Sequence, residues 1–206
     1  MATDLETKYV CNASPYLGKD LSRQKGERLA ENVVINLMEP FLDDGRNVMT
    51  DSFFTSLSLS HRLLQRKTAL MGTVNKDRRE LPQLAKDTAR PEVFFTSVLR
   101  SGSVSLTIYA PKKNKAVCVP SSMHQDVKIG DGRKRKPNTI TYYNHMKCGV
   151  DVLDQMAWMY SVKAATRRWP VAFFKNMLDL AAVNAYILHK ACTGWTGKRR
   201  LFESSS

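Results

Sequence analysis

The sequence predicts an α/β fold with a β-rich segment in its middle and helices at its end. Three observations lead to this prediction. Helical apolar spacing alternates with short apolar runs over residues 26–74, the pattern of an α/β layer. Alternating residues separated by turn residues follow over 93–121, and helical spacing returns from residue 149 onward.

The first half of the chain supplies two strands that we expect to be parallel. A short strand is expected at residues 7–12, and helices are expected at 26–42 and 52–65. Two further short strands, at 46–50 and in the compact apolar run 68–74, are expected on either side of the second of these helices. A strand–helix–strand order favours parallel pairing of the two runs, with the later one buried.

The pattern of apolar and turn residues changes in the second half of the chain. Runs at 93–99, 103–109 and 116–119 predict an antiparallel meander, and the Gly- and Lys-rich stretch 126–138 is typical of a loop. A different set of elements follows this loop. We expect a short strand at 139–143 and helices at 149–160 and 169–191, the last with Pro170 in its first turn. Its apolar stripe is broad, which is more typical of a packed core helix than of a membrane-surface helix, and its length also fits assembly with another subunit.

Composition and charge narrow the possible partners. At 206 residues, with 43% hydrophobic and 25% charged residues, the chain fits one globular domain, or one domain with an insertion. The formal net charge of +13 favours a polyanionic partner such as nucleic acid, although a basic surface also serves solubility. The basic residues gather at 112–136, 163–168 and 198–200.

The scattered cysteines and the lack of a long apolar run indicate a chain in a reducing compartment, without secretion or a membrane span. The four cysteines are scattered without a C-x-x-C pair, which indicates free thiols in a reducing compartment and neither disulfides nor a zinc site. No apolar run approaches 18 residues, and the N-terminus lacks the features of a signal peptide. No membrane partner is therefore expected. Phosphate loops, nucleophile elbows and H-E-x-x-H motifs do not occur in the sequence.

Four aspartates occupy positions where carboxylates could hold divalent cations. Asp51 follows a predicted parallel strand, Asp151 and Asp154 share one side of a predicted helix, and Asp4 precedes the first short strand. Carboxylates that meet from separate elements can bind two Mg²⁺ or Mn²⁺ ions for phosphoryl transfer. The same positions also suit helix capping at Asp51 and the helix dipole at the other two, so spacing alone leaves both interpretations open.

Four blocks of the sequence resemble the piggyBac family of transposases and its domesticated relatives. They are D-L-E-T-K-Y with Y-L-G at 4–18, N-V-M-T-D-S-F-F-T-S at 47–56, G-T-V with R-R-E-L-P at 72–82, and Y-N-H-M-K-C-G-V-D-V-L-D with R-W-P at 143–170. The blocks follow the family's order with similar gaps and cover nearly the whole chain. The last block is highly specific.

The resemblance implies an RNase H-like core with a DDD metal triad. Asp4, Asp51 and Asp151 match the three catalytic positions, and Asp154 matches a fourth acidic position close to them. The implied organisation has four segments. These are the first part of the core at 1–76, a β-rich insertion at 77–138, the helix with the third aspartate at 139–160, and part of a helical dimerisation and DNA-binding region at 161–206.

The resemblance also implies chemistry on DNA that depends on Mg²⁺ or Mn²⁺. Water nicks one strand at each element end, and the freed 3′-hydroxyl attacks the opposite strand to form a hairpin. After the hairpin is resolved, the element's 3′-hydroxyls are joined to TTAA target DNA. Basic residues are the expected phosphate contacts, namely Lys163, Arg167, Arg168, Lys134 and Arg135. DNA and a possible homodimer are the implied partners, with no small-molecule substrate, and the implied location is the nucleus.

Two departures from the family leave the function open between alternatives. Only three residues precede Asp4, so the first strand of the core is expected to be incomplete, and no Cys/His zinc domain follows Ser206. One alternative is a truncated or domesticated catalytic core that needs further segments for activity. The other is a catalytically inactive derivative that binds DNA or protein. A generic RNA-binding module is disfavoured, because neither an RNP-like strand nor a KH loop occurs.

Overall fold

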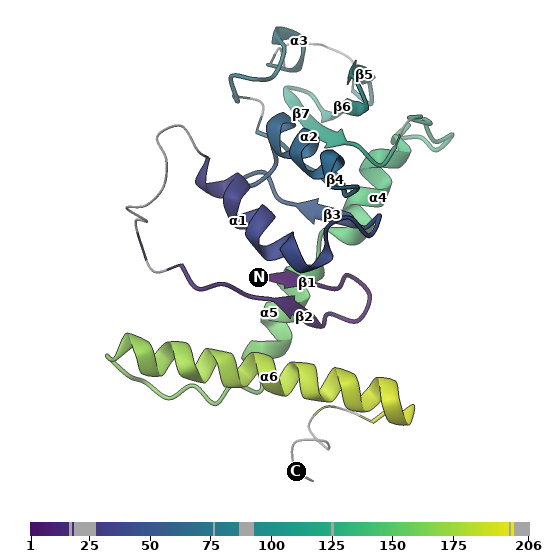
Figure 1. The fold of residues 1–206 in the computed structure, drawn as a ribbon. Coiled ribbons are helices and arrows are strands. Elements are labelled where there is room, and N and C mark those ends of the chain that lie inside the picture. The colour runs from purple at the N-terminus through teal and green to yellow at the C-terminus, as the bar shows by residue number, and fades with distance from the viewer. Residues whose placement is uncertain are drawn as a thin grey trace. The chain divides into compact units, whose positions relative to one another are not determined.

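The computed structural model describes residues 1–16, 18, 28–75, 77–86, 93–124, 126–197 and 199. The chain divides into two compact units, whose elements are labelled in Figure 1. Unit 1 comprises residues 1–15 and 148–206, and unit 2 comprises residues 16–147. The four segments expected from the sequence, divided after residues 76, 138 and 160, stay a prediction.

A mixed five-stranded sheet forms the centre of unit 2. Strands β3 (Asn47–Thr50) and β4 (Ala69–Gly72) pair in parallel, as predicted. Strands β5 (Thr96–Ser101), β6 (Val104–Lys112) and β7 (Lys115–Ser121) form the predicted antiparallel meander. Because β7 also pairs antiparallel with β4, both parts share one sheet with the order β3-β4-β7-β6-β5.

Helices cover both faces of this sheet. Helices α1 (Leu29–Met38), α2 (Leu57–Gln65) and α3 (Gln83–Lys86) lie on one face, and α4 (Asn138–Met146) lies on the other (Figure 1). A short 3₁₀ helix, η1 (Glu39–Phe41), follows α1. Leu70 of β4 packs with α1 and α2, whereas its neighbour Met71 packs with Ile140 of α4. Successive strand residues point to opposite faces, so this strand joins two cores.

Residues 139–143 form part of helix α4, so the prediction of a strand there is wrong. Their β-branched and aromatic side chains favour strands in general. Here, however, the buried Thr139 and Ile140 and the half-buried Tyr143 recur at helical spacing and pack on the sheet. The Thr139 hydroxyl also donates a hydrogen bond to Thr107 Oγ1 of β6 at 3.1 Å. Tertiary packing therefore overrides local propensity.

Helix α2 begins at Leu57, five residues later than the predicted start at Ser52. Ser56 is its N-cap, and the Ser56 side chain accepts a hydrogen bond from the backbone N–H of Leu59 at 3.0 Å. Residues 52–54 form a turn instead. That turn follows Asp51, so the later start of the helix bears directly on the candidate site.

Unit 1 joins a small antiparallel hairpin to two helices. The hairpin consists of β1 (Ala2–Thr3) and β2 (Val10–Asn12), and the helices are α5 (Gly149–Met159) and α6 (Trp169–Thr193). Leu153 and Ala157 of α5 pack with Val183 of α6 and with Val10 of the hairpin. Asn184 of α6 accepts a hydrogen bond from Val10 N at 2.8 Å and donates one to Val10 O at 3.1 Å. The Asn184 carboxamide thus satisfies both backbone groups of Val10, as a residue of a paired strand would.

Helix α6 matches the predicted element, from Pro170 in its first turn to a left-handed Gly194 at its end. Of its 25 residues only Asp179 and Val183 are buried, and the apolar stripe is largely exposed, with Trp169 at 68%. By length and composition alone α6 would be long enough to cross a membrane. That is weak evidence, because core helices of soluble proteins pass the same test.

Candidate active site

Asp51 directly follows β3 at the carboxyl end of the parallel β3–β4 pair, as the sequence predicts. Its Oδ1 accepts hydrogen bonds from the backbone N–H groups of Phe53 at 3.0 Å and Phe54 at 3.2 Å. The side chain is exposed, and Oδ2 accepts no hydrogen bond from the described residues. The alternative that Asp51 caps the following helix is wrong, because Ser56 is the N-cap of α2. The Asp51 side chain instead accepts the backbone N–H groups of the turn that directly follows it.

Close packing beside this turn fixes where Asp51 lies. The Thr55 hydroxyl donates to the Asp51 carbonyl oxygen at 2.6 Å and lies 2.7 Å from Thr50 Oγ1. Gly72 of β4 leaves the room for this arrangement. A Cβ at Gly72 would lie 2.2 Å from Thr55 Oγ1 and 2.5 Å from the Thr50 carbonyl oxygen, so any larger residue would displace the turn. The glycine of the G-T-V motif therefore has a structural explanation.

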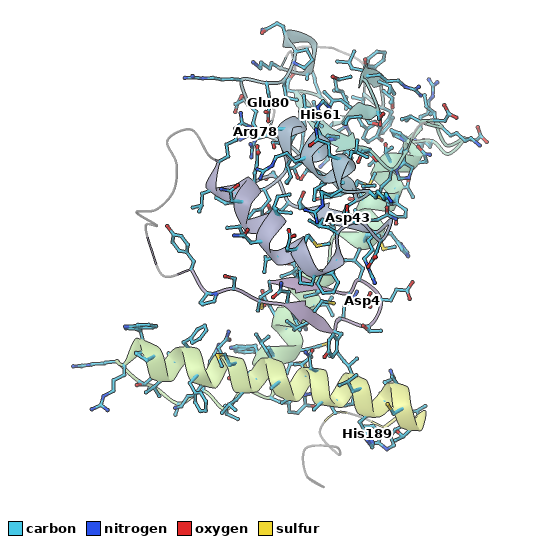
Figure 2. All side chains as sticks on the ribbon, viewed as in Figure 1. Asp4, Asp43, His61, Arg78, Glu80 and His189 are labelled. Carbon is cyan, nitrogen blue, oxygen red and sulfur yellow. The ribbon has the colours of Figure 1, made fainter. Side chains whose placement is uncertain are left out.

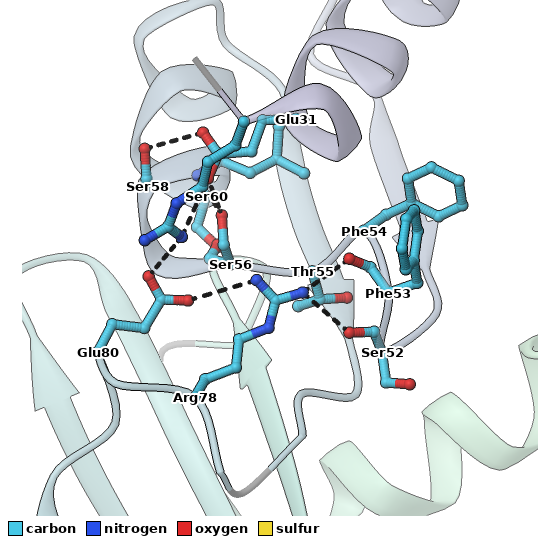
Figure 3. A network of polar contacts seen from close by, with 12 residues as sticks. Glu31, Ser52, Phe53, Phe54, Thr55, Ser56, Ser58, Ser60, Arg78 and Glu80 are labelled. Atoms are coloured by element: carbon cyan, nitrogen blue, oxygen red, sulfur yellow. Dashed lines mark hydrogen bonds and ion pairs between the residues drawn. The ribbon is translucent and has the colours of Figure 1, made fainter. Parts of the chain in front are cut away.

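Arg78 holds the same turn from another side (Figure 3). Its Nη2 donates hydrogen bonds to the carbonyl oxygens of Phe53 at 2.7 Å and Ser52 at 3.1 Å. The Glu80 carboxylate lies 3.8 Å from Arg78 Nη1 and accepts a hydrogen bond from Arg28 at 2.9 Å. Sequence reasoning used residues 78–82 only as a family motif and missed this role. Spacing gave no signal for it, because the turn lies 25 residues earlier in the chain.

Glu31 connects this network to α1. The side chain is buried, at 3% exposure, and accepts hydrogen bonds from the hydroxyls of Ser56 at 2.6 Å and Ser58 at 3.0 Å. Arg28 and Arg62 lie 3.4 and 3.6 Å from its oxygens. A buried carboxylate is tolerated only where such donors satisfy it. Because Ser56 is the N-cap of α2, Glu31 helps to define where the turn after Asp51 ends.

Asp4 lies in the turn between β1 and β2, and Figure 2 labels it there. Its Oδ1 accepts hydrogen bonds from the Thr7 hydroxyl at 2.6 Å, from Thr7 N at 2.7 Å and from Glu6 N at 3.2 Å. These donors, the Thr7 hydroxyl first, stabilise the carboxylate and lower the pKa of Asp4 below its ordinary value. As at Asp51, Oδ2 accepts no hydrogen bond from the described residues.

Asp151 and Asp154 lie one turn apart on α5 and are both exposed. Among the described residues neither carboxylate has a hydrogen-bonding partner, so the helix-dipole alternative remains open for both. Gly149 places this helix next to the Asp4 segment, since a Cβ there would lie 2.6 Å from Leu5 Cδ2. The structure thus brings Asp4 and Asp151 onto neighbouring elements of unit 1.

Asp51 belongs to unit 2, apart in sequence from the aspartates of unit 1. Within the described part of either unit, no three His, Cys, Asp or Glu side chains gather as a metal site. The chemistry of the donors nevertheless suits a hard cation. Asp4 and Asp51 each keep one carboxylate oxygen uncommitted, and Asp151 keeps both. Mg²⁺ and Mn²⁺ prefer such oxygen ligands.

The predicted phosphate contacts lie on exposed segments of both units. Lys163, Arg167 and Arg168 are exposed between α5 and α6 in unit 1. Lys134 and Arg135 are exposed in the loop of unit 2, where the Tyr109 hydroxyl donates to the Lys134 carbonyl oxygen at 2.6 Å.

The third basic cluster, at 198–200, behaves differently. Arg199 is 6% exposed, donates a hydrogen bond to the Met156 carbonyl oxygen and stacks over the Tyr160 ring at 5.1 Å. Its guanidinium therefore packs against α5 and the Tyr160 ring and is shielded from solvent. Lys198 and Arg200 lie outside the described residues.

Known proteins resemble this chain over most of its length. The family described as Transposase IS4 matches residues 1–186. Human piggyBac transposable element-derived protein 3 is 25% identical in an alignment of 198 positions, which covers 88% of this chain and 33% of the human protein. The human chimeric ERCC6-PGBD3 protein is also 25% identical, over 19% of its own length.

A solved structure is similar in fold as well as in sequence. It is a cryo-EM structure of a piggyBac transposase synaptic complex with hairpin DNA, with a TM-score of 0.90 and 33% identity. The match covers 98% of this chain and 43% of the solved one, so this chain spans less than half the length of the proteins it matches. The match confirms the predicted α/β, RNase H-like fold.

Proposed function

Because the chain belongs to the Transposase IS4 family and is of the piggyBac type, we propose that it cuts and joins DNA strands with divalent cations. The proposed substrate is duplex DNA at transposon ends, with TTAA as the target sequence. The proposed reactions are hydrolysis of one phosphodiester by water and attack of the freed 3′-hydroxyl on the opposite strand to form a hairpin. Hydrolysis of the hairpin then releases the 3′-hydroxyl again, and the 3′ ends are joined to the target.

One observation carries this proposal. Asp4 and Asp51, at the ends of strands in different units, are held in the same way: Oδ1 accepts N–H groups of the next residues, and Oδ2 stays open. This arrangement fixes each carboxylate without using up its capacity to bind a cation. The likeness to a transposase bound to DNA supports the same interpretation.

Each residue then has a role in the proposed site. Asp4, Asp51 and Asp151 would hold Mg²⁺ or Mn²⁺, with Asp154 as a fourth ligand. The bound ions would activate the attacking oxygen and stabilise the leaving one. The hydrogen bonds from Thr7 lower the pKa of Asp4 below its ordinary value, so they favour the ionised form that a cation would bind.

The basic residues would bind the DNA backbone. Lys163, Arg167 and Arg168, together with Lys134 and Arg135, would contact phosphates and set the position of the strand without reading its sequence. We also propose a nuclear location and assembly as a homodimer. The exposed basic residues 133–136 would then serve as an import signal.

A second candidate function is DNA binding without cleavage, in a transposon-derived protein. The formal net charge of +13 favours it, because charge alone supports binding to any duplex. Such a protein would keep the fold and the basic surface but would make no use of Asp51.

A nicking assay on supercoiled plasmid and on duplexes with TTAA flanks separates the two functions. We expect nicking that requires Mg²⁺ or Mn²⁺ and that drops to the metal-free level in Asp51→Asn, while DNA affinity is retained. The control is Asp44→Asn, which removes the same charge from an exposed side chain that pairs, among the described residues, only with Arg46 at 3.6 Å. Tight binding without nicking would favour the second function, and nicking that survives Asp51→Asn would rule out the proposed site.

A further inference from the structure

Asp179 of α6 is a buried carboxylate with no part in the proposed metal site. It is 1% exposed, and within the described part of the chain no cation pairs with it. Both of its oxygens are nevertheless satisfied. Oδ2 accepts the Ser161 hydroxyl at 2.6 Å, and Oδ1 accepts the backbone N–H of Val162 at 2.8 Å. Burial of a charge is costly unless it is hydrogen-bonded in this way.

These bonds fix the start of residues 161–168, the basic segment that joins α5 to α6. Ser161 Oγ, held by Asp179, in turn accepts the backbone N–H of Lys163 at 3.1 Å. Lys175, one turn before Asp179 on α6, donates to the Ala164 carbonyl oxygen at 3.4 Å. The segment is therefore tied to α6 at two places, and the stronger tie is the buried carboxylate.

The basic segment presents exposed cations. Lys163, Arg167 and Arg168 are exposed, and no carboxylate pairs with them among the residues that the structure describes. Lys163 also lines a hollow of about 410 Å³ together with Asp154, Trp158 and Asn176. Cations carried on a fixed backbone bind phosphates at a lower entropic cost than cations on a mobile one.

We propose that Asp179 is a positioning residue that holds the basic segment in the form that contacts DNA phosphates. The inference rests on the proposed function for its ligand, and Asp179 itself would touch no DNA. The proposal predicts a change in DNA affinity that is opposite to the change expected from charge alone. Removing a negative charge from a DNA-binding protein should tighten binding through the overall field. If Asp179 positions the segment, its removal should weaken binding instead.

The first arm of the test measures the segment without DNA, on the full chain. Asp179→Ala should speed trypsin cleavage after Lys163, Arg167 and Arg168 by about tenfold or more, because a hydrogen bond to a charged group is lost. Asp179→Asn should be milder, since its amide still accepts from Val162 N. Tryptophan fluorescence checks folding, because Trp158, Trp169 and Trp195 all belong to unit 1. If Asp179→Ala fails to fold, Ser161→Ala serves in its place with the same expected direction.

The second arm measures duplex binding by fluorescence anisotropy at several salt concentrations. Asp179→Ala should bind more weakly, with a salt slope reduced by about 0.9 for each lost phosphate contact, and Asp179→Asn should recover most of the affinity. The matched control Asp44→Ala should bind as tightly as the wild type or tighter.

Unchanged cleavage in Asp179→Ala, or tighter DNA binding, would overturn the proposal. A wild type that binds no duplex would overturn the proposed function and the DNA role of Asp179 together. In that case the cleavage arm alone still decides whether Asp179 holds the segment, so the two failures can be told apart.

Discussion

Replacing Arg78 by alanine should loosen the turn that carries Asp51. Arg78 Nη2 donates to two carbonyl oxygens of that turn, at 2.7 and 3.1 Å, and the side chain is 25% exposed. A hydrogen bond from a charged donor contributes about 1.5–3 kcal/mol. Because one nitrogen makes both bonds and water partly screens it, we expect a loss of about 2 kcal/mol. For a chain of this size that corresponds to a Tm lowered by about 4–8 °C.

The assay needs a probe in unit 2, where no tryptophan occurs. Far-UV circular dichroism during urea unfolding gives the global change, and amide hydrogen exchange gives the local one. We expect the Phe53 and Phe54 amides to exchange about 10–30 times faster in Arg78→Ala. The matched control is Arg79→Ala, which removes the same charge from an exposed neighbour. It should leave the exchange of both amides unchanged.

Two results would refute this reasoning. One is unchanged exchange at Phe53 and Phe54 in Arg78→Ala, which would mean that the turn holds itself. The other is an equal loss in Arg79→Ala, which would mean that charge, and not the two hydrogen bonds, is responsible.

Three further predictions concern groups elsewhere in the fold. Thr7→Val removes the largest cause of the lowered pKa of Asp4, so this pKa should rise toward 3.8 in an NMR titration. The stability that the ionised Asp4 contributes should then be lost at a higher pH than in the wild type as the solution is acidified. Burial lowers the pKa of His124 below 6.5, so the unfolded chain takes up the proton first; urea midpoints should fall as the pH drops below about 6.5, and His124→Gln should flatten this dependence. Glu31→Leu leaves the hydroxyls of Ser56 and Ser58 without their acceptor and should cost about 2–4 kcal/mol in urea unfolding, whereas Ser58→Ala should cost about 1 kcal/mol.

Much of the fold could be predicted because its signals are local. The alternation of β5 to β7, the parallel order of β3 and β4 and the Pro170 start of α6 all follow from periodicity and turn residues. Helix α4 could not be predicted in this way. Its residues are good strand formers, and what makes them helical is the packing of Ile140 against the sheet, which no short window of sequence contains.

The candidate site divides along the same line. The position of Asp51 at the end of a strand follows from the order of the elements. The hydrogen bonds from Arg78 to the turn, in contrast, join segments that lie 25 residues apart in the sequence. Asp179 is a further case. In the sequence it is one acidic residue in an apolar helix, and only the structure shows that the carboxylate is buried and holds Ser161.

The central proposal, that Asp4, Asp51 and Asp151 bind divalent cations, is tested most directly by Mn²⁺ titration of the ¹⁵N-labelled chain. Manganese broadens nearby NMR signals, so the account predicts joint broadening of amides at residues 4–7, 51–55 and 150–155, with one affinity, and its joint loss in Asp51→Asn. Broadening confined to a single segment, or left unchanged in Asp51→Asn, would contradict the claim.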